Sequence, residues 1–249
     1  MKKLLTILLV TLMALTLAAC NDSKKFKKSE GVMTYEEYAA APLESKVTIE
    51  GFVQGAQSYW NGASIYVQDD KGGYFLYGIG ISEADYAKLV SSTNYAPGWT
   101  GLANGAKIKV TGYKAEWSGE VEVIDAEEIV VDDSVKWVAD PTDVTAKLGT
   151  DELVKYQNMK VAFKGLKVAT APRYNWDGSG AAGSNSDVYF DLTDGTNNYE
   201  FVVESYLCYE GSDVYNKVLE LKVGDTVDVE GFLYWYNGPD THVTKVTVK

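Results

Sequence analysis

The sequence predicts a mainly β protein that consists of two small five-stranded barrels in tandem. Three observations lead to this fold class. Val, Ile, Tyr, Trp and Gly are abundant in the 249 residues, whereas long helical periods are scarce. The chain contains a degenerate internal duplication, and each copy has the order strand, strand, strand, helical stretch, strand, strand.

The duplication is clearest near the end of each copy. Residues 104–112 (NGAKIKVTG) align without a gap with residues 223–231 (VGDTVDVEG). Near the start of each copy, residues 47–51 (VTIEG) correspond to residues 161–165 (VAFKG). Because one module occurs twice, each copy is expected to form a small domain of its own.

In the first copy, apolar and polar residues alternate along short segments, as they do in half-buried strands. The expected strands cover residues 46–54, 63–69, 74–79, 107–115 and 120–131, and a helix is expected at 83–91. Gly51 and Gly112 lie inside these strands, where a missing Cβ permits the bulges that close a small barrel. Thr34 and Glu37 have the spacing of a capping box and predict a short entry helix.

The second copy follows the same plan. Its expected strands cover residues 159–168, 187–192, 199–203, 226–234 and 242–248, with a helical stretch within 205–221. Thr150, followed by Asp151 and Glu152, predicts a threonine-capped entry helix. Five strands with a helix between the third and the fourth is the chain order of the OB-fold, a partly open Greek-key barrel. Both domains are therefore expected to be OB-fold-like.

The N-terminus has the features of an export signal. Lys2 and Lys3 precede an apolar run that stops at Cys20, and this run is too short to be a comfortable membrane span. Leu17-Ala18-Ala19-Cys20 resembles the lipobox of bacterial lipoproteins, in which the cysteine is acylated and becomes the first mature residue. The resemblance implies a protein that is exported and lipid-anchored to a bacterial membrane or cell surface.

These observations together divide the chain. The expected parts are a signal peptide (1–19), a lipidated flexible tether (20–33), a first OB-fold-like domain (34–131), a linker (132–145) and a second OB-fold-like domain (146–249). In the first domain, the segments TIEGFV, SIYVQDD and ANGAKIKVTGY resemble OB-fold modules of bacterial surface lipoproteins and of secreted nucleases. In such nucleases a separate domain catalyses the reaction, so the resemblance implies a non-catalytic binding accessory.

Composition gives little support to catalysis or to phosphate binding. His242 is the only histidine, and Cys208 is the only thiol left once Cys20 is acylated, so no nucleophile with a recognisable base is apparent. We expect no enzyme activity, cofactor or metal. Removal of residues 1–19 takes away two lysines and no acidic residue, which changes the formal charge from −12 to −14. Arg173 is the only arginine, so strong non-specific nucleic-acid binding is disfavoured.

Aromatic residues occur in both loops that flank the ligand-binding face of an OB barrel. These candidate ligand-binding residues are Tyr59, Trp60 and Trp117 in the first copy and Tyr174, Trp176, Tyr234 and Tyr236 in the second. They could stack on sugars or bases, or they could instead pack the barrels. The expected function is glycan binding by a membrane-anchored lipoprotein. A nucleic-acid-binding accessory, with nucleic acid the less expected partner, and an envelope assembly component are the alternatives.

The lipobox assignment predicts that Cys20→Ser abolishes acylation, because the serine hydroxyl cannot replace the thiol that accepts the lipid. Metabolic labelling with a fatty acid and detergent extraction of membranes measure the result. Labelled protein should be lost and the chain should leave the membrane fraction. An unchanged membrane fraction would show that the assignment is wrong.

Overall fold

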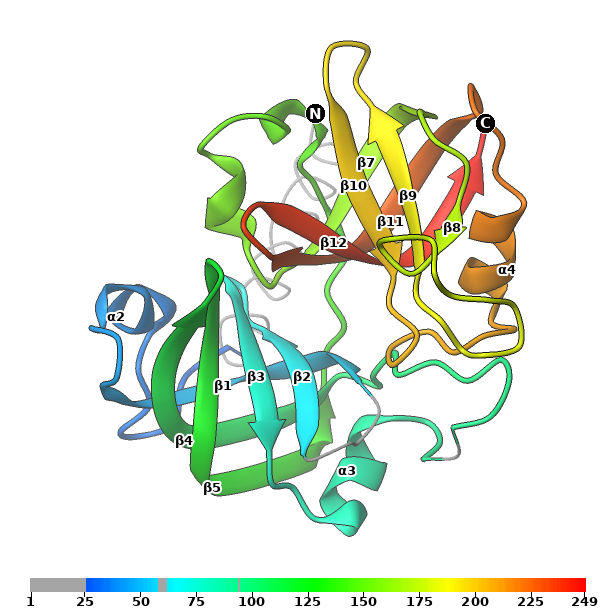
Figure 1. The fold of residues 1–249 in the computed structure, drawn as a ribbon. Coiled ribbons are helices and arrows are strands. Elements are labelled where there is room, and N and C mark those ends of the chain that lie inside the picture. The colour runs from blue at the N-terminus through cyan, green and yellow to red at the C-terminus, as the bar shows by residue number, and fades with distance from the viewer. Residues whose placement is uncertain (1–25, 58–61, 94) are drawn as a thin grey trace, which may run out of the picture.

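The structure is a computed structural model that describes residues 26–57, 62–93 and 95–249, and its two β-barrels lie next to each other (Figure 1). The first barrel is closed by five strands in the order β1-β2-β3-β5-β4. They are β1 (Lys46–Ala56), β2 (Ala63–Gln68), β3 (Gly73–Ile79), β4 (Ala106–Trp117) and β5 (Glu120–Lys136), with helix α2 (Tyr35–Ala40) before β1 and α3 (Glu83–Leu89) after β3. Only the β3–β5 pairing is parallel among the strand pairs described for this barrel.

The second barrel repeats this plan with additions at its edges. Its sheet has the order β6-β7-β11-β12-β10-β9-β8, and pairing of β7 with β9 closes the ring. The elements are β6 (Thr142–Asp143), the 3₁₀ turns η1 (Thr145–Lys147) and η2 (Leu153–Tyr156), β7 (Lys160–Val168), β8 (Arg173–Tyr174), β9 (Val188–Thr193), β10 (Asn198–Val203), α4 (Asp213–Leu219), β11 (Thr226–Trp235) and β12 (Pro239–Val248). The prediction of two tandem OB-fold-like barrels, each with a helix between the third and fourth strands, is confirmed.

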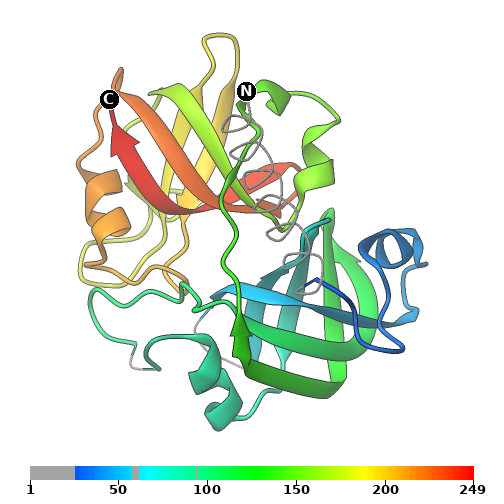
Figure 2. The same cartoon turned by 180° about the vertical axis from the view of Figure 1, so that it is seen from behind.

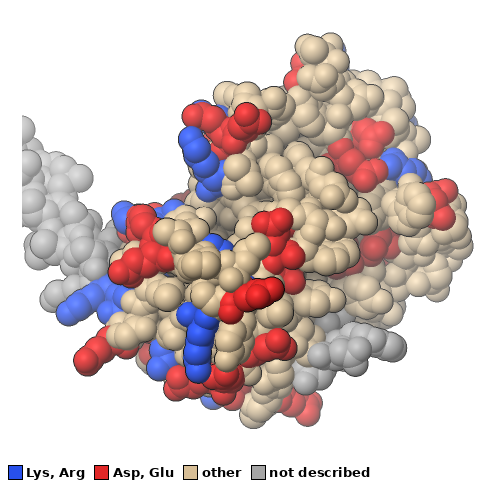
Figure 3. Space-filling model, turned by 60° about the vertical axis from the view of Figure 1, so that its left-hand side comes forward, with Lys and Arg blue, Asp and Glu red and all other residues tan. Residues whose placement is uncertain are grey.

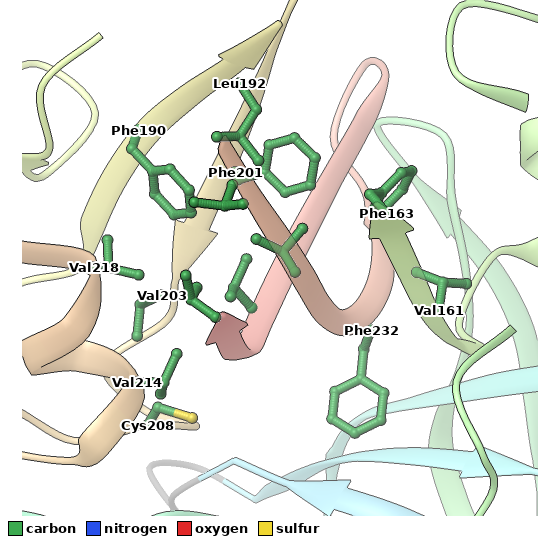
Figure 4. Close-up of a cluster of buried hydrophobic side chains, with 14 of the residues drawn as sticks. Val161, Phe163, Phe190, Leu192, Phe201, Val203, Cys208, Val214, Val218 and Phe232 are labelled. Atoms are coloured by element: carbon green, nitrogen blue, oxygen red, sulfur yellow. The ribbon is translucent and has the colours of Figure 1, made fainter. Parts of the chain in front are cut away.

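Apolar side chains that alternate along the strands fill each barrel. In the second barrel, Val188, Phe190 and Leu192 of β9 point inward with Phe163 and Phe201, and Figure 4 shows these side chains converging. Register shifts at Gly112 and Gly231 bend β4 and β11, as expected of glycines that permit a bulge. Each fully buried Phe or Leu contributes about 1.5–3 kcal/mol through apolar burial.

The two entry segments differ from each other. Thr34 and Glu37 form the predicted capping box at α2, with the Glu37 N–H donating to Thr34 Oγ1 at 3.2 Å. The predicted cap at Thr150 is wrong. Its hydroxyl donates to the Lys147 carbonyl, and the 3₁₀ turn η2 begins three residues later without a side-chain cap. Thr150 therefore closes the preceding turn and does not start a helix.

Both segments expected to be irregular are partly ordered against the barrels. Residues 26–33, at the end of the expected tether, lie on the first barrel, where the Phe26 ring packs 4.9 Å from Trp137 and 5.7 Å from Phe52. Within the expected linker, β5 continues to Lys136 and Thr142 pairs with β7. Strand pairing is made by backbone groups, so it is compatible with charged side chains. The charged residues between 132 and 136 are exposed on β5. No helix of the described ranges is long and apolar enough to span a membrane.

Aromatic side chains from both barrels meet at a contact region that we call the seam. The seam consists of Tyr66 and Phe75, on the outer side of β2 and β3, and of Phe232, Tyr234 and His242 on β11 and β12. The Phe232 ring stacks on Tyr66 with 4.3 Å between centroids and 12° between planes. Figure 4 shows Phe232 pointing away from the second barrel's core, towards the first barrel. The seam therefore extends the hydrophobic core of the second barrel onto the outer side of β2 and β3.

Backbone hydrogen bonds also cross between the barrels. The Gly101 N–H donates to Leu207 O at 2.7 Å, and the Tyr209 N–H donates to Trp99 O at 2.9 Å. At the other side, the Asn237 N–H donates to Ser118 O at 2.7 Å, which joins the β11–β12 turn to the β4–β5 turn. The connecting chain runs along the back of the molecule (Figure 2). Packing and backbone pairing thus hold the barrels in one arrangement.

Phe232→Ala should lower the free energy of unfolding by about 3–5 kcal/mol, as for other buried Phe→Ala changes. The loss arises because Tyr66 and the core beneath it lose their packing partner. Urea unfolding followed by far-UV circular dichroism and Trp fluorescence measures it, with the exposed Val223→Ala as a control expected to stay within about 0.5 kcal/mol. A loss below 1 kcal/mol for Phe232→Ala would contradict this role.

Candidate functional site

The ligand-binding side of an OB barrel is the outer side of its second and third strands, flanked by two loops. In the first barrel this surface is the outer side of β2 and β3, which forms half of the seam. Tyr66 is 0% and Phe75 2% exposed, because Phe232 and Tyr234 of the second barrel cover them. The second barrel therefore covers the central part of this ligand face, and Tyr77, further along β3, stays 56% exposed.

The equivalent surface of the second barrel is accessible, and we call it the open face. It is formed by Tyr189 and Asp191 on β9, Glu200 on β10, and Arg173 and Trp176 from the segment between β7 and β9. Strand alternation places the first three outward, because Val188, Phe190 and Phe201 occupy the inward positions. Trp176 is 72% exposed, the highest value among the exposed large hydrophobic side chains described.

Arg173 is held in the centre of the open face. Strand β8 pairs Arg173 with Tyr189, and the guanidinium lies 5.9 Å from the centre of the Tyr189 ring. The guanidinium also forms ion pairs with Glu200 and, at 3.6 Å, with Asp191. Its Nε donates to the Trp176 carbonyl at 3.2 Å, which fixes the loop that carries the exposed indole. These contacts position a planar cation against an aromatic ring.

The glycine-rich loop beyond Trp176 is tied down by one carboxylate. Glu210 accepts from the Gly183 N–H at 2.6 Å and from the Asn185 N–H at 2.9 Å, while its own N–H donates to Asn185 Oδ1. Glu210 O also accepts from the Gly98 N–H of the first barrel at 2.9 Å. The loop beside the open face is therefore linked to both barrels through a single residue.

The charge of the open face is acidic overall. One guanidinium is matched by the carboxylates of Asp191 and Glu200, and Asp187 lies at the start of the same strand. On the side drawn in Figure 3, basic side chains are isolated and stand beside acidic ones, without a continuous basic patch. Such a surface offers stacking and hydrogen-bond acceptors, and it offers little attraction to phosphate groups.

The predicted aromatic residues do not form one surface. Trp117 and Tyr236 face each other across the joined turns, with ring centroids 5.2 Å apart, and both are about half exposed. Tyr174 is half-buried against the core of the second barrel, and Tyr234 lies in the seam, where it stacks on His242 at 4.6 Å. Only Trp176 reaches the open face. Tyr59, Trp60 and the expected acylation site Cys20 lie outside the described residues.

Sequence reasoning missed Arg173, Tyr189, Asp191 and Glu200 as site residues. Two signals could have indicated them. Arg173 is the only arginine of an acidic chain, and Tyr189 aligns with Tyr66 of the other copy. Aromatic content of the loops was a poorer guide, because most of those rings pack on neighbouring rings.

The two groups considered for nucleophilic chemistry are in unreactive states. Burial raises the pKa of the Cys208 thiol to about 12, so the thiolate is scarce near neutral pH. Burial lowers the pKa of His242 to about 3. The Tyr66 hydroxyl lies 2.8 Å from His242 Nδ1 in the seam, which gives the neutral imidazole a hydrogen-bond partner. Both side chains are buried in packed parts of the protein.

Two aspartates, in the β2–β3 and β9–β10 turns, have structural roles as well. Asp69 Oδ1 accepts from the N–H groups of Lys71 and Gly72, and Asp194 Oδ1 accepts from those of Thr196 and Asn197. These are turn contacts of the kind that Asp makes in hairpins. In the described ranges, His, Cys, Asp and Glu side chains do not gather in threes in a way that could hold a metal ion.

Neither a protein-family model nor a curated protein sequence matches the chain. Solved structures of DNA-binding proteins do match. A murine DNA-binding protein bound with double-stranded DNA has 13% identity and a TM-score of 0.34 over 81% of this chain and 96% of that chain. The p202 HIN1 domain in complex with a 12-mer duplex has 13% identity and a TM-score of 0.30, over 90% and 98%. Single-stranded DNA binding protein from Thermus aquaticus has 12% identity and a TM-score of 0.27, over 82% and 92%.

The expected glycan ligand is corrected by these findings. The matching structures are of proteins named for DNA binding, and two of them hold duplex DNA. The sequence predicts two partners: a glycan, and a membrane that is reached through a lipid on Cys20. Neither is the partner in those structures. The geometry gives an additional reason, because the aromatic platform on which glycan binding depended is divided between the seam, the joined turns and the open face.

His242 should not titrate in the folded protein between pH 5 and pH 8, because burial holds its pKa at about 3. The imidazole 15N and 13C chemical shifts, followed by NMR, should stay constant across this range. In urea, the same ring should titrate near its ordinary pKa of about 6.5. An inflection near that pH in the folded protein would mean that the seam admits water to His242.

Proposed function

We propose that this protein binds single-stranded nucleic acid on the open face of its second barrel, and that it does so without catalysis. One observation carries the proposal. The only arginine of the chain is held over the Tyr189 ring, beside the exposed Trp176, on the OB-fold ligand surface that the seam leaves accessible. The first barrel supplies the support, and the second supplies the contact surface.

The contacts available to a bound strand are mainly stacking contacts. Trp176 presents its indole to solvent, and its backbone carbonyl accepts a hydrogen bond from Arg173. A planar guanidinium and an aromatic ring each stack well on nucleobases, and aromatic stacking contributes about 1–3 kcal/mol per base. This energy does not depend on base identity, so a range of sequences can be bound.

The carboxylates of the open face favour unpaired bases over duplex. Asp191 and Glu200 can accept hydrogen bonds from exocyclic amino groups, as acidic side chains do from cytosine N4. In a duplex, the bases are stacked inside and phosphates face the protein, which carries a formal charge of −12. A single strand can turn its bases inward and leave its phosphates in water.

Location and lack of catalysis are part of the same proposal. Export is supported by the charged and apolar N-terminal segment that ends at Cys20. A non-catalytic role is supported by the buried, neutral His242 and by the raised pKa of Cys208. We therefore place the protein outside the cytoplasm, as a binding module for nucleic acid in that compartment.

Fluorescence anisotropy with labelled 12-nucleotide single strands and the matching duplexes tests the proposal. We expect the single strands to bind more tightly, and Trp176→Ala to weaken their binding by about 5- to 150-fold, the equivalent of about 1–3 kcal/mol for one stacked base. Because Arg173 is already paired with carboxylates, the slope of log K against log salt should be shallow, with a magnitude of about 1 or less.

Arg173→Ala should also weaken binding, because it removes the cation over Tyr189 and releases the Trp176 loop. The control is Tyr113→Ala, since Tyr113 lies on β4 of the first barrel, where its hydroxyl donates to the surface residue Glu127 at 2.8 Å. Unchanged binding by both Trp176→Ala and Arg173→Ala would reject the open face. Tighter binding of duplex than of single strands would reject the proposed ligand.

A further inference from the structure

Acidic residues from both barrels lie beside the aromatic residues of the seam. Glu120 and Glu122 come from β5 of the first barrel, and Asp240 comes from β12 of the second. Glu120 accepts from the Trp235 N–H, Glu122 pairs with Phe75 across β5 and β3, and Asp240 lies opposite Tyr234 in the β11–β12 pair. The Tyr234 ring stacks on His242 and meets Phe75 edge-on at 5.4 Å. Acidic groups therefore lie where the two barrels are held together.

The hydrogen bonding of these carboxyls is incomplete. Glu120 is 0% exposed. Its Oε2 accepts from the Trp235 N–H at 2.9 Å and from Gln157 Nε2 at 3.2 Å, both in the second half of the chain. Glu120 Oε1 and Asp240 Oδ1 are buried without a hydrogen-bond partner among the described residues. An ionised carboxylate in such a position loses its hydration without compensation, so the closed seam favours the protonated acid.

We infer that the seam is a proton-dependent latch, which is closed while Glu120, Glu122 and Asp240 hold their protons and which loosens as they ionise. Parting of the barrels would return each carboxylate to water and would remove the unfavourable burial of its charge. The same movement would uncover Tyr66 and Phe75. Use of these rings as a second stacking surface rests on the proposed function, whereas the latch itself does not.

The pKa values of the three acids define the pH range in which the latch acts. Burial raises the pKa of Glu122 from 4.5 to about 7. Burial, with Glu200 and Asp187 nearby, raises the pKa of Asp240 from 3.8 to about 7. Burial raises the pKa of Glu120 from 4.5 to about 9. An acid with a raised pKa in the closed state stabilises that state at low pH, and this stabilisation is lost as pH rises towards the raised value.

Glu204 and His242 also make the stability of the closed seam depend on pH. Glu204, which accepts from Gln57 Nε2 of the first barrel at 3.0 Å, has a pKa far above its usual range because of burial and Asp187, so it acts with the three acids. His242 acts in the opposite direction, because its lowered pKa makes the closed state less stable as pH falls below about 6.5. Lys114 lies outside the seam, over the Tyr38 ring, where it donates to three backbone carbonyls of residues 38–41 and burial lowers its pKa.

The difference in pKa between the open and closed states determines how steeply opening depends on pH. Between the ordinary and the raised pKa, each carboxyl that ionises on opening increases the ratio of open to closed molecules about tenfold per pH unit. Glu120, Glu122 and Asp240 act together with Glu204 from about pH 5 to pH 7, and Glu120 and Glu204 continue to act above pH 7. The latch therefore responds most steeply in mildly acidic solution, where free acidic side chains are already ionised.

Amide hydrogen exchange across the seam measures the opening directly. The N–H groups of Gly101, Tyr209 and Asn237 all donate from one barrel to the other, so they exchange when the barrels part. NMR exchange rates at pH 5, 6 and 7, corrected for the intrinsic pH dependence, should show protection that falls by at least tenfold per pH unit. In the triple variant Glu120→Gln, Glu122→Gln, Asp240→Asn, this decline should be much shallower than in the wild type, because only Glu204 remains to ionise on opening.

The control carries the same change of charge at exposed positions, through Glu83→Gln, Glu116→Gln and Asp133→Asn, and should keep the wild-type decline. Should the triple variant not fold, Glu122→Gln and Asp240→Asn made singly should each reduce the slope. Protection that is independent of pH in the wild type, or an equal decline in the seam variants and the control, would overturn the latch. Because no nucleic acid is added, failure of the proposed function leaves this result unaffected.

Discussion

The stacking of Phe232 on Tyr66 is the interaction on which the arrangement of the whole molecule depends. It joins two barrels by extending the apolar core of the second onto the outer side of the first, while the first barrel keeps a separate core of its own. It also uses the surface with which an OB barrel usually meets its ligand as a surface for internal packing. Duplication of a module has therefore produced one supporting barrel and one accessible barrel, and not two equal binding sites.

This division accounts for several features that look unrelated in the sequence. Gly55 lies so close to Phe232 that a Cβ there would be 2.7 Å from the ring, so a side chain would prevent the barrels from meeting. Glu120, Glu122 and Asp240 are acidic residues in positions where a surface strand would ordinarily expose them. Glu120 and Glu122 are buried, and Asp240 is half-buried with one enclosed carboxyl oxygen. The acidity of the chain has thereby become part of its internal structure.

The fold could be predicted from the sequence because its signals are local. Strand alternation, glycines at bulges and the capping box of α2 depend on neighbours in the chain, and the repeat doubles each signal. The candidate site could not be predicted in the same way. The extent to which Tyr66 or Tyr189 is covered depends on which barrel packs against the other: Tyr66 is fully buried, whereas the aligned Tyr189 is half-buried. Likewise, Phe26 is an isolated ring in a charged run, and its place beside Trp137 is a long-range contact that no local pattern encodes.

Glu210 has a consequence for how the two barrels influence each other. Its carboxylate holds the loop next to the open face, while its carbonyl accepts from Gly98 of the first barrel. One residue therefore belongs to both the ligand surface and the contact between the barrels. Thermodynamic reciprocity then applies: a ligand that binds only the ordered loop must favour the joined state to the same extent that joining favours the ligand. Ligand affinity at the open face and the stability of the contact between the barrels therefore report the same coupling free energy.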